Sequence, residues 1–167
     1  LYAKITTGSQ YITILSDSVM IGSLPAGSEK LISNKLTVRV SDNIKDNSLV
    51  TLYITVTDHD GSYNFPVDFA IHAPELDILS FYLDDASSGN GDQIANPGET
   101  LSLIFSVKND GSSSISGKFS ISSSDAGITI LEPTKNSGLL SDGMMTEIPV
   151  LVKLSQSVNS GTTISVN

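Results

Sequence analysis

Hydrophobic and polar residues alternate along much of this chain, and a period of two is typical of a β-strand with one buried face. The alternation runs through residues 50–57 and 64–71, and the polar sequence Asp58–Ser62 between them has the composition of a turn. These two segments are therefore predicted to form a β-hairpin. The same pattern predicts strands at 101–107, 115–121 and 148–154, with a turn at Lys108–Gly111.

No window shows a sustained apolar stripe at helical spacing, and the many Ser, Thr, Val and Ile residues favour strands. Short strands separated by Gly, Asn, Asp and Ser are typical of an antiparallel sandwich. The predicted fold class is therefore all-β, with tandem Ig-like antiparallel β-sandwich domains.

Comparison of the chain with itself reveals an internal repeat. Tyr2–Gly27 aligns without a gap on Lys118–Gly143, at an offset of 116, and eight of the 26 pairs are identical. After a slip of two residues the correspondence continues, with Leu36, Val38, Val40, Ser41 and Ile44 aligned on Val150, Val152, Leu154, Ser155 and Val158.

The repeat is out of frame with the two ends of the chain. Residues 1–75 hold the later strands of one copy and residues 76–167 the early and middle strands of the next, with the boundary at Ala73–Glu75. Both sandwiches are thus expected to be partial, and the chain, which starts with neither a signal peptide nor a natural initiation sequence, is expected to be excised from a longer protein. Incomplete edges of this kind are also expected to favour self-association or strand swapping.

Three motifs give the chain a family resemblance. They are the GNGD…NPGE loop at Gly89–Glu99, the KNDG sequence at Lys108–Gly111 and the ITIL…G-x-L-x-x-G run present in both copies. With them, the whole chain resembles the tandem Ig-like repeats that follow gingipain-like cysteine peptidases and some other secreted peptidases of Gram-negative anaerobes.

The resemblance implies a secreted or cell-surface multidomain protein, commonly exported by type IX secretion, in which these repeats are non-catalytic spacers or adhesive modules. The partners it implies are the other domains of the parent protein and a host or surface protein or glycan. The Cys and His dyad of the peptidase would lie outside this chain, which contains no cysteine.

Charge and composition exclude several other classes of function. With 9 basic and 18 acidic residues the net charge is −9, which disfavours nucleic acid and anionic membranes as partners. No apolar run is long enough for a membrane span. The absence of cysteine excludes disulfides, thiolate zinc sites and a cysteine nucleophile within the chain.

The acidic, glycine-rich stretch Asp84–Glu99 is the candidate metal site. Calcium prefers six to eight oxygen ligands from carboxylates, amides and carbonyls in a tight loop. An EF-hand is not predicted, because Ser88 and Gln93 stand where that motif needs Asp and Gly. A calcium site of another geometry is the hypothesis, against the alternative of solvated acids and glycine turns; its ligands would be Asp84, Asp85, Asn90, Asp92 and Glu99.

The remaining candidates are weaker. His59 between Asp58 and Asp60 has the composition of a triad pair or a metal ligand, but an exposed hairpin turn is the favoured interpretation, and His72 is assigned no role. No serine lies in a G-x-S-x-G elbow, so no catalytic residue and no certain cofactor is predicted. The alternative function is binding of carbohydrate or protein on a sandwich face, for which the aromatic candidates are Tyr2, Tyr11, Tyr53, Tyr63 and Tyr82.

Overall fold

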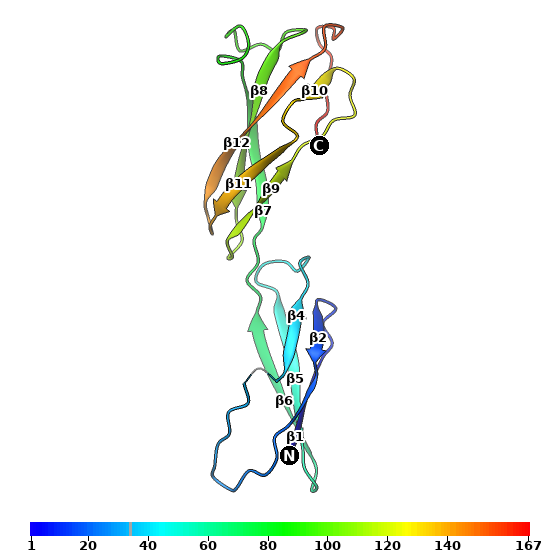
Figure 1. The fold of residues 1–167 in the computed structure, drawn as a ribbon, viewed down its shortest axis with the longest axis vertical. Helices are drawn as coiled ribbons and strands as arrows, with labels where there is room; N and C mark the ends of the chain where they lie inside the picture. Colours follow the sequence, from blue (N-terminus) through cyan, green and yellow to red (C-terminus); the bar gives the residue numbers. More distant parts are fainter. Residues whose placement is uncertain (34) are drawn as a thin grey trace. The chain divides into compact units, whose positions relative to one another are not determined.

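The structure of the protein is a computed structural model that describes residues 1–33 and 35–167 (Figure 1). Within this part of the chain every regular element is a β-strand and all strand pairs are antiparallel, so the predicted all-β class is confirmed. The part of the chain that the structure describes contains no helix that could span a membrane. The chain divides into two compact units, Leu1–Ala73 (unit 1) and Pro74–Asn167 (unit 2).

Unit 1 contains a four-stranded sheet, in the order β3-β1-β5-β6, and a separate pair of strands, β2 and β4. The predicted hairpin is confirmed, since β5 and β6 pair along their whole length with Leu49 opposite Ala70. The strands are β1 (Tyr2–Thr7), β2 (Ile12–Ser16), β3 (Ser18–Met20), β4 (Thr37–Val40), β5 (Leu49–Thr57) and β6 (Ser62–Ala70).

The core of unit 1 joins its two sheets. Ile12 of β2 and Val50 of β5 are buried in one cluster with Ile44 and Ile71, and Val38, Val40, Leu52 and Phe69 pack against it. The β2–β4 pair therefore covers part of one face of the four-stranded sheet, as in a two-layered sandwich.

Unit 2 also contains a four-stranded sheet, in the order β10-β12-β8-β7, and a separate pair, β11 and β9. Its strands are β7 (Leu76–Asp84), β8 (Thr100–Asn109), β9 (Ile115–Ser120), β10 (Ile128–Ile130), β11 (Thr134–Leu140) and β12 (Met145–Leu154).

The core of unit 2 is larger and lies between these two layers. Leu101, Val150 and Val152 are fully buried on the four-stranded sheet, and Leu140 of β11 is fully buried on the facing layer. Alternate residues of β8 and β12 point inward in register, because Leu101 lies opposite Val152 and Phe105 opposite Ile148. The alternation read from the sequence thus identifies the buried face of both strands.

One predicted turn is displaced. Lys108 and Asn109 were expected in the turn after β8, but they are the last residues of that strand, because β7 pairs with β8 as far as Leu76 opposite Asn109. The chain reverses only after Asn109, and it then enters β9, which belongs to the other sheet. The connection therefore crosses from one layer to the other instead of closing a hairpin.

Strand pairs in the two units have matching registers. Tyr2 lies opposite Met20 in the β1–β3 pair, and Lys118 lies opposite Asn136 in the β9–β11 pair, 116 residues further along. Ile12 lies opposite Val40 in the β2–β4 pair, and Ile128 lies opposite Leu154 in the β10–β12 pair. β1, β2, β3 and β4 thus occupy the same pairing positions as β9, β10, β11 and β12.

Candidate functional site

The acidic loop joins β7 to β8 and is held by its own carboxylates. Asp85 is fully buried, and its Oδ2 accepts the backbone N–H of Gln93 at 3.0 Å. The Glu99 carboxylate accepts two backbone N–H groups, that of Asn90 at 2.8 Å and that of Asn96 at 2.9 Å. Two acids therefore satisfy backbone donors that a loop of this length would otherwise leave without partners.

Asp92 organises the tip of the same loop. Its Oδ1 accepts the Ile94 N–H at 2.9 Å, and its Oδ2 accepts the Asn90 side-chain amide at 3.0 Å. The pKa of Asp92 is lowered, chiefly by the backbone hydrogen bond from Ile94. Asp84, at the end of β7, accepts the N–H of Ala86 at 3.0 Å. Each acid of the predicted calcium site thus has a hydrogen-bond donor from the protein itself.

Asp84 ends β7 and the other four predicted calcium ligands lie in the loop that follows, but they are arranged around backbone N–H groups. A cation would share these carboxylates with the N–H donors, because a carboxylate has about four lone-pair sites. In the described chain, the one group of three or more acidic or histidine side chains with ligand atoms within 4.8 Å of one another is Asp58, His59 and Asp60, outside this loop. Calcium at the loop stays a prediction; calorimetry tests it, and an absence of heat when calcium is added to chelator-treated protein would remove it.

The Asp58–Asp60 group forms the turn between β5 and β6. Asp58 Oδ1 accepts the N–H groups of Asp60 and Gly61 at 2.8 and 2.9 Å, and these two donors lower the pKa of Asp58. His59 Nε2 lies 3.0 Å from Asp60 Oδ1, with 88% of the His59 side chain exposed. A catalytic triad needs an imidazole sheltered between an acid and a nucleophile, so this geometry supports the hairpin-turn interpretation. His72 is exposed just beyond β6.

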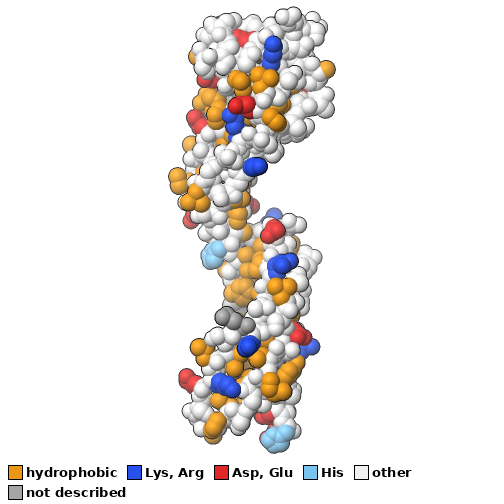
Figure 2. All heavy atoms as spheres, in the orientation of Figure 1, with side chains coloured by type: hydrophobic (Ala, Val, Ile, Leu, Met, Phe, Trp, Pro, Cys, Tyr) orange, Lys and Arg blue, Asp and Glu red, His pale blue; other side chains and the backbone are white. Residues whose placement is uncertain are grey.

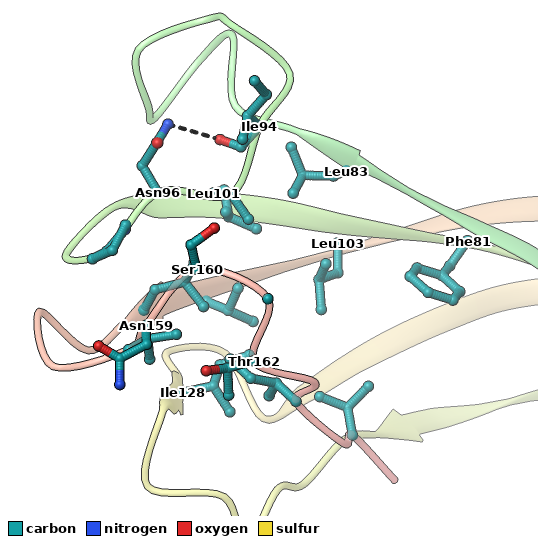
Figure 3. A pocket seen from close by; sticks show the side chains of 18 residues that line it. Phe81, Leu83, Ile94, Asn96, Leu101, Leu103, Ile128, Asn159, Ser160 and Thr162 are labelled. Atoms are coloured by element: carbon teal, nitrogen blue, oxygen red, sulfur yellow. Dashed lines mark hydrogen bonds between the residues drawn. The ribbon is translucent and has the colours of Figure 1, made fainter.

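A cavity of about 550 Å³ opens into the interior of unit 2 (Figure 3). Its walls are apolar, and its polar groups, which include Asn96 and Thr162, carry no charge. Asn96 donates its side-chain amide to the carbonyl of Ile94 at 3.0 Å, away from the apolar walls. The residues that form these walls include Phe81, Leu83, Leu101, Leu103, Ile128, Val152, Ile164 and Val166.

The cavity lies between the four-stranded sheet of unit 2 and residues 158–166, and its apolar lining has the chemistry of an incompletely filled core. Its lining includes the hydroxyl groups of Ser160 and Thr162, but it holds no acidic, basic or imidazole side chain that could act as the general base a hydroxyl nucleophile needs. Sequence reasoning did not identify it. The repeat could have indicated that residues 164–166 contribute to the core of unit 2. β4 and β12 align at an offset of 114, and the same offset aligns Ile164 and Val166 with Val50 and Leu52 of unit 1.

The five tyrosines do not form a flat strip. All are exposed, but Tyr82 belongs to unit 2 and Tyr11 to the turn before β2. Tyr53 and Tyr63 lie on opposite faces of the β5–β6 hairpin, because Tyr53 pairs with Pro66 and Tyr63 with Val56. Grouped tyrosines were the expected sign of a carbohydrate-binding face, and scattered ones favour a spacer.

Comparison of the chain with protein-family models, with curated proteins and with solved structures found no match.

Proposed function

We propose that the chain is a non-catalytic structural module, made of parts of two consecutive copies of one Ig-like β-sandwich in a secreted or cell-surface multidomain protein. The observation that carries the proposal is the matching of strand registers between the two units. A module repeated along a chain serves as a spacer or stalk, because each copy buries its own core and adds length without adding chemistry.

In addition to the strand registers, individual hydrogen bonds support the two-copy organisation. Thr7 Oγ1 donates to the carbonyl of Thr51 at 2.8 Å, and Ser123 Oγ donates to the carbonyl of Ser165 at 2.6 Å. The N–H of Ser41 donates to Tyr11 O at 2.8 Å, and that of Ser155 donates to Gly127 O at 2.9 Å. In each case the second bond joins the positions that the repeat assigns to the first.

The chemistry of the polar groups supports a structural role. The acids at Asp58, Asp85, Asp92 and Glu99 accept backbone N–H groups in turns and loops, which is a conformational use of a carboxylate. The location at the cell surface and the attachment to a gingipain-like peptidase are inferences from the sequence resemblance, and they form part of the proposal.

Activity measurements test the proposed function. We expect the purified chain to release no fluorophore from a library of quenched peptides and to retain no glycan on an array. Peptide hydrolysis that scales with the concentration of the chain and disappears in His59→Ala would overturn the non-catalytic assignment. Glycan retention lost in Tyr53→Ala would instead favour the carbohydrate-binding alternative.

A protein ligand is the second candidate function, and exposed apolar side chains on the four-stranded sheets favour it. Phe65 of β6 is 52% exposed and Phe81 of β7 is 64% exposed. On the side seen in Figure 2, hydrophobic side chains reach the surface of both units. Apolar groups gathered on one face of a sheet mark a surface that another protein covers.

A further inference from the structure

The tip of the acidic loop carries an Asn-Gly pair. Asn90 and Gly91 are both exposed, and no other asparagine of the sequence is followed by glycine. Gly91 has a φ of +78°, and no atom outside residues 90–92 lies within 4 Å of the position that a Cβ would occupy. Among the described residues, no protein acceptor takes the Gly91 N–H. The peptide nitrogen after Asn90 is therefore sterically open and has no hydrogen bond to lose.

The side chain of Asn90 is held beside this nitrogen by Asp92. Asn90 Oδ1 accepts the N–H of Asp92 at 3.0 Å, and Asn90 Nδ2 donates to Asp92 Oδ2, also at 3.0 Å. Because both bonds reach the second residue along the chain, the amide group lies along the intervening Gly91 peptide. The Asn90 N–H donates to Glu99 Oε1 at 2.8 Å, which fixes the backbone on the other side.

We propose that Asn90 is a self-modification site, at which the Gly91 nitrogen displaces the side-chain nitrogen of Asn90 as ammonia. Solvent base removes the Gly91 N–H proton, the nitrogen attacks Asn90 Cγ, and the Cγ–Nδ2 bond breaks as Nδ2 leaves with a proton from water. The product is a five-membered succinimide ring. Attack within one residue pair needs no second molecule to be brought into place. The Asp92 N–H donates to Oδ1, the atom on which negative charge develops.

Water then opens the succinimide ring in one of two ways. Attack at Cγ breaks the new bond between nitrogen and Cγ and leaves an aspartate at this position. Attack at the main-chain carbonyl carbon breaks its bond to nitrogen, so the chain continues through Cγ as isoaspartate, with one extra methylene in the backbone. Water is the co-reactant in both cases, and nothing is oxidised or reduced.

Both products remove contacts that hold the loop tip. A new carboxylate replaces the Nδ2 donor, so a like charge faces Asp92 Oδ2 where a hydrogen bond of 3.0 Å stood. Ile94 depends on the same Asp92 carboxylate, which accepts its N–H at 2.9 Å. Modification is therefore expected to loosen the loop around Ile94 and to add one negative charge to a chain of −9.

Peptide mapping by mass spectrometry tests the proposal on the full chain kept in mildly alkaline buffer. Asn90 is expected to lose its amide before any other asparagine, and faster as the pH is raised, because the attacking nitrogen must lose its proton. Asn136, which is exposed and precedes Ser137, is the internal comparison and is expected to stay intact while Asn90 converts. The same chain unfolded in urea is the positive control for the chemistry. An Asn90 that stays intact in the folded chain while it converts in urea would overturn the proposal.

Two variants separate the reaction from its effect on the loop. Asn90→Gln keeps an amide but needs a larger ring, so the conversion at this position is expected to be lost; conversion at an unchanged rate would contradict the mechanism. Asn90→Asp carries the product charge from the start and is expected to speed hydrogen exchange at the Ile94 amide. Asn136→Asp makes the same charge change on β11 and is expected to leave that exchange unchanged.

These results are independent of the proposed spacer function, which does not require an unmodified loop. Exchange at Ile94 that is the same in Asn90→Asp and in the wild type would show that the modification does not loosen the loop. That outcome, like an unreactive Asn90, would remove the inference and leave the two-copy organisation intact.

Discussion

At the scale of single residues, Asn109 shows how a buried polar group holds a connection between layers. Its Oδ1 accepts the N–H groups of Glu75 and Gly111, both at 3.1 Å. Its Nδ2 donates to the carbonyls of Ser113 and Leu140, at 2.8 and 3.1 Å. The side chain is fully buried, and its four bonds tie the start of β7, the turn after β8 and the end of β11 together.

The KNDG motif indicated a turn at this position but not the burial of its asparagine. Asn is common in exposed turns, where its side chain bonds to nearby backbone, and the same letters fit both situations. Burial is decided by β7, which is distant in sequence and places Leu76 opposite Asn109. The sequence pattern therefore located the connection after β8, but it did not identify Asn109 as the residue that stabilises this connection.

Asn109→Ala is expected to lower the free energy of unfolding of unit 2 by about 2 to 3 kcal/mol, because it leaves buried backbone donors and acceptors without partners. Asn136→Ala, at an exposed position of β11, is the control and is expected to change stability by less than about 0.5 kcal/mol. Urea denaturation followed by circular dichroism measures both. Equal effects of the two substitutions would contradict the role assigned to Asn109.

At the scale of elements, the alternation of hydrophobic and polar residues predicted the long strands that pair along their length within a sheet. It placed β5, β6, β8 and β12 and identified the buried side of β8 and β12. It did not show which aligned segments lack a neighbour. Residues 31–33 align with Met145–Glu147 of β12, yet they form no strand, and Leu31 is 89% exposed. In unit 2 the aligned residues pair with β8, and no described strand of unit 1 takes the place of β8.

Under the two-copy proposal, residues at aligned positions of the two units are expected to contribute unequally to stability. Val152 of β12 is fully buried, whereas Val38, at the same position of β4, is only partly buried. Val152→Ala is expected to destabilise unit 2 by about 2 kcal/mol, from about 0.8 kcal/mol per buried methylene plus a cavity contribution. Val38→Ala is expected to destabilise unit 1 clearly less. Denaturant midpoints report the difference, and equal losses would argue against a half-covered sheet in unit 1.

The turn of the β5–β6 hairpin should make unit 1 sensitive to acid. The pKa of Asp58 is lowered from its ordinary value of 3.8 by the N–H groups of Asp60 and Gly61. A depressed pKa in the folded state means that the stabilisation is complete above the pKa of the unfolded chain and is lost as the pH falls through the folded value. Stability should therefore fall below about pH 4.

Asp58→Asn keeps an oxygen acceptor and removes the titration, so its stability should depend less on pH between about 4 and 2 than that of the wild type. Thermal unfolding at several pH values measures this slope. Asp60→Asn, whose carboxylate accepts neither of these turn N–H groups, is the comparison. Identical slopes for wild type and Asp58→Asn would show that Asp58 does not stabilise the turn.

At the scale of the whole molecule, the sequence predicted an all-β fold and a repeat, but not how the last residues of the chain pair. That pairing joins residues that are far apart in the sequence. Ser122 and Asn167 exchange two backbone hydrogen bonds of 2.8 Å, at the positions where Thr6 pairs with Tyr53 in unit 1. Asn167 thus pairs next to β9 in the way that Tyr53 of β5 pairs with β1, and residues 164–167 align with the first part of β5.

The candidate site was predicted less well than the fold. The acidic loop was identified from its composition, which reports the presence of carboxylates but not their use. In the structure Asp85 and Glu99 bond to backbone N–H groups, and that use depends on the loop conformation. The apolar cavity escaped prediction, because an alternating strand looks the same whether or not a second layer covers it.

The claim that these are two copies of one sandwich can be tested directly by completing unit 2. Since Asn167 takes the position of Tyr53, the chain is lengthened after Asn167 by a second copy of residues 54–73, with a scrambled version of the same segment as control. Hydrogen exchange then follows the amides of β9 that face away from β11. The two-copy account predicts strong new protection at Lys118–Ser120 with the true segment and none with the scrambled one; equal exchange in both would contradict it.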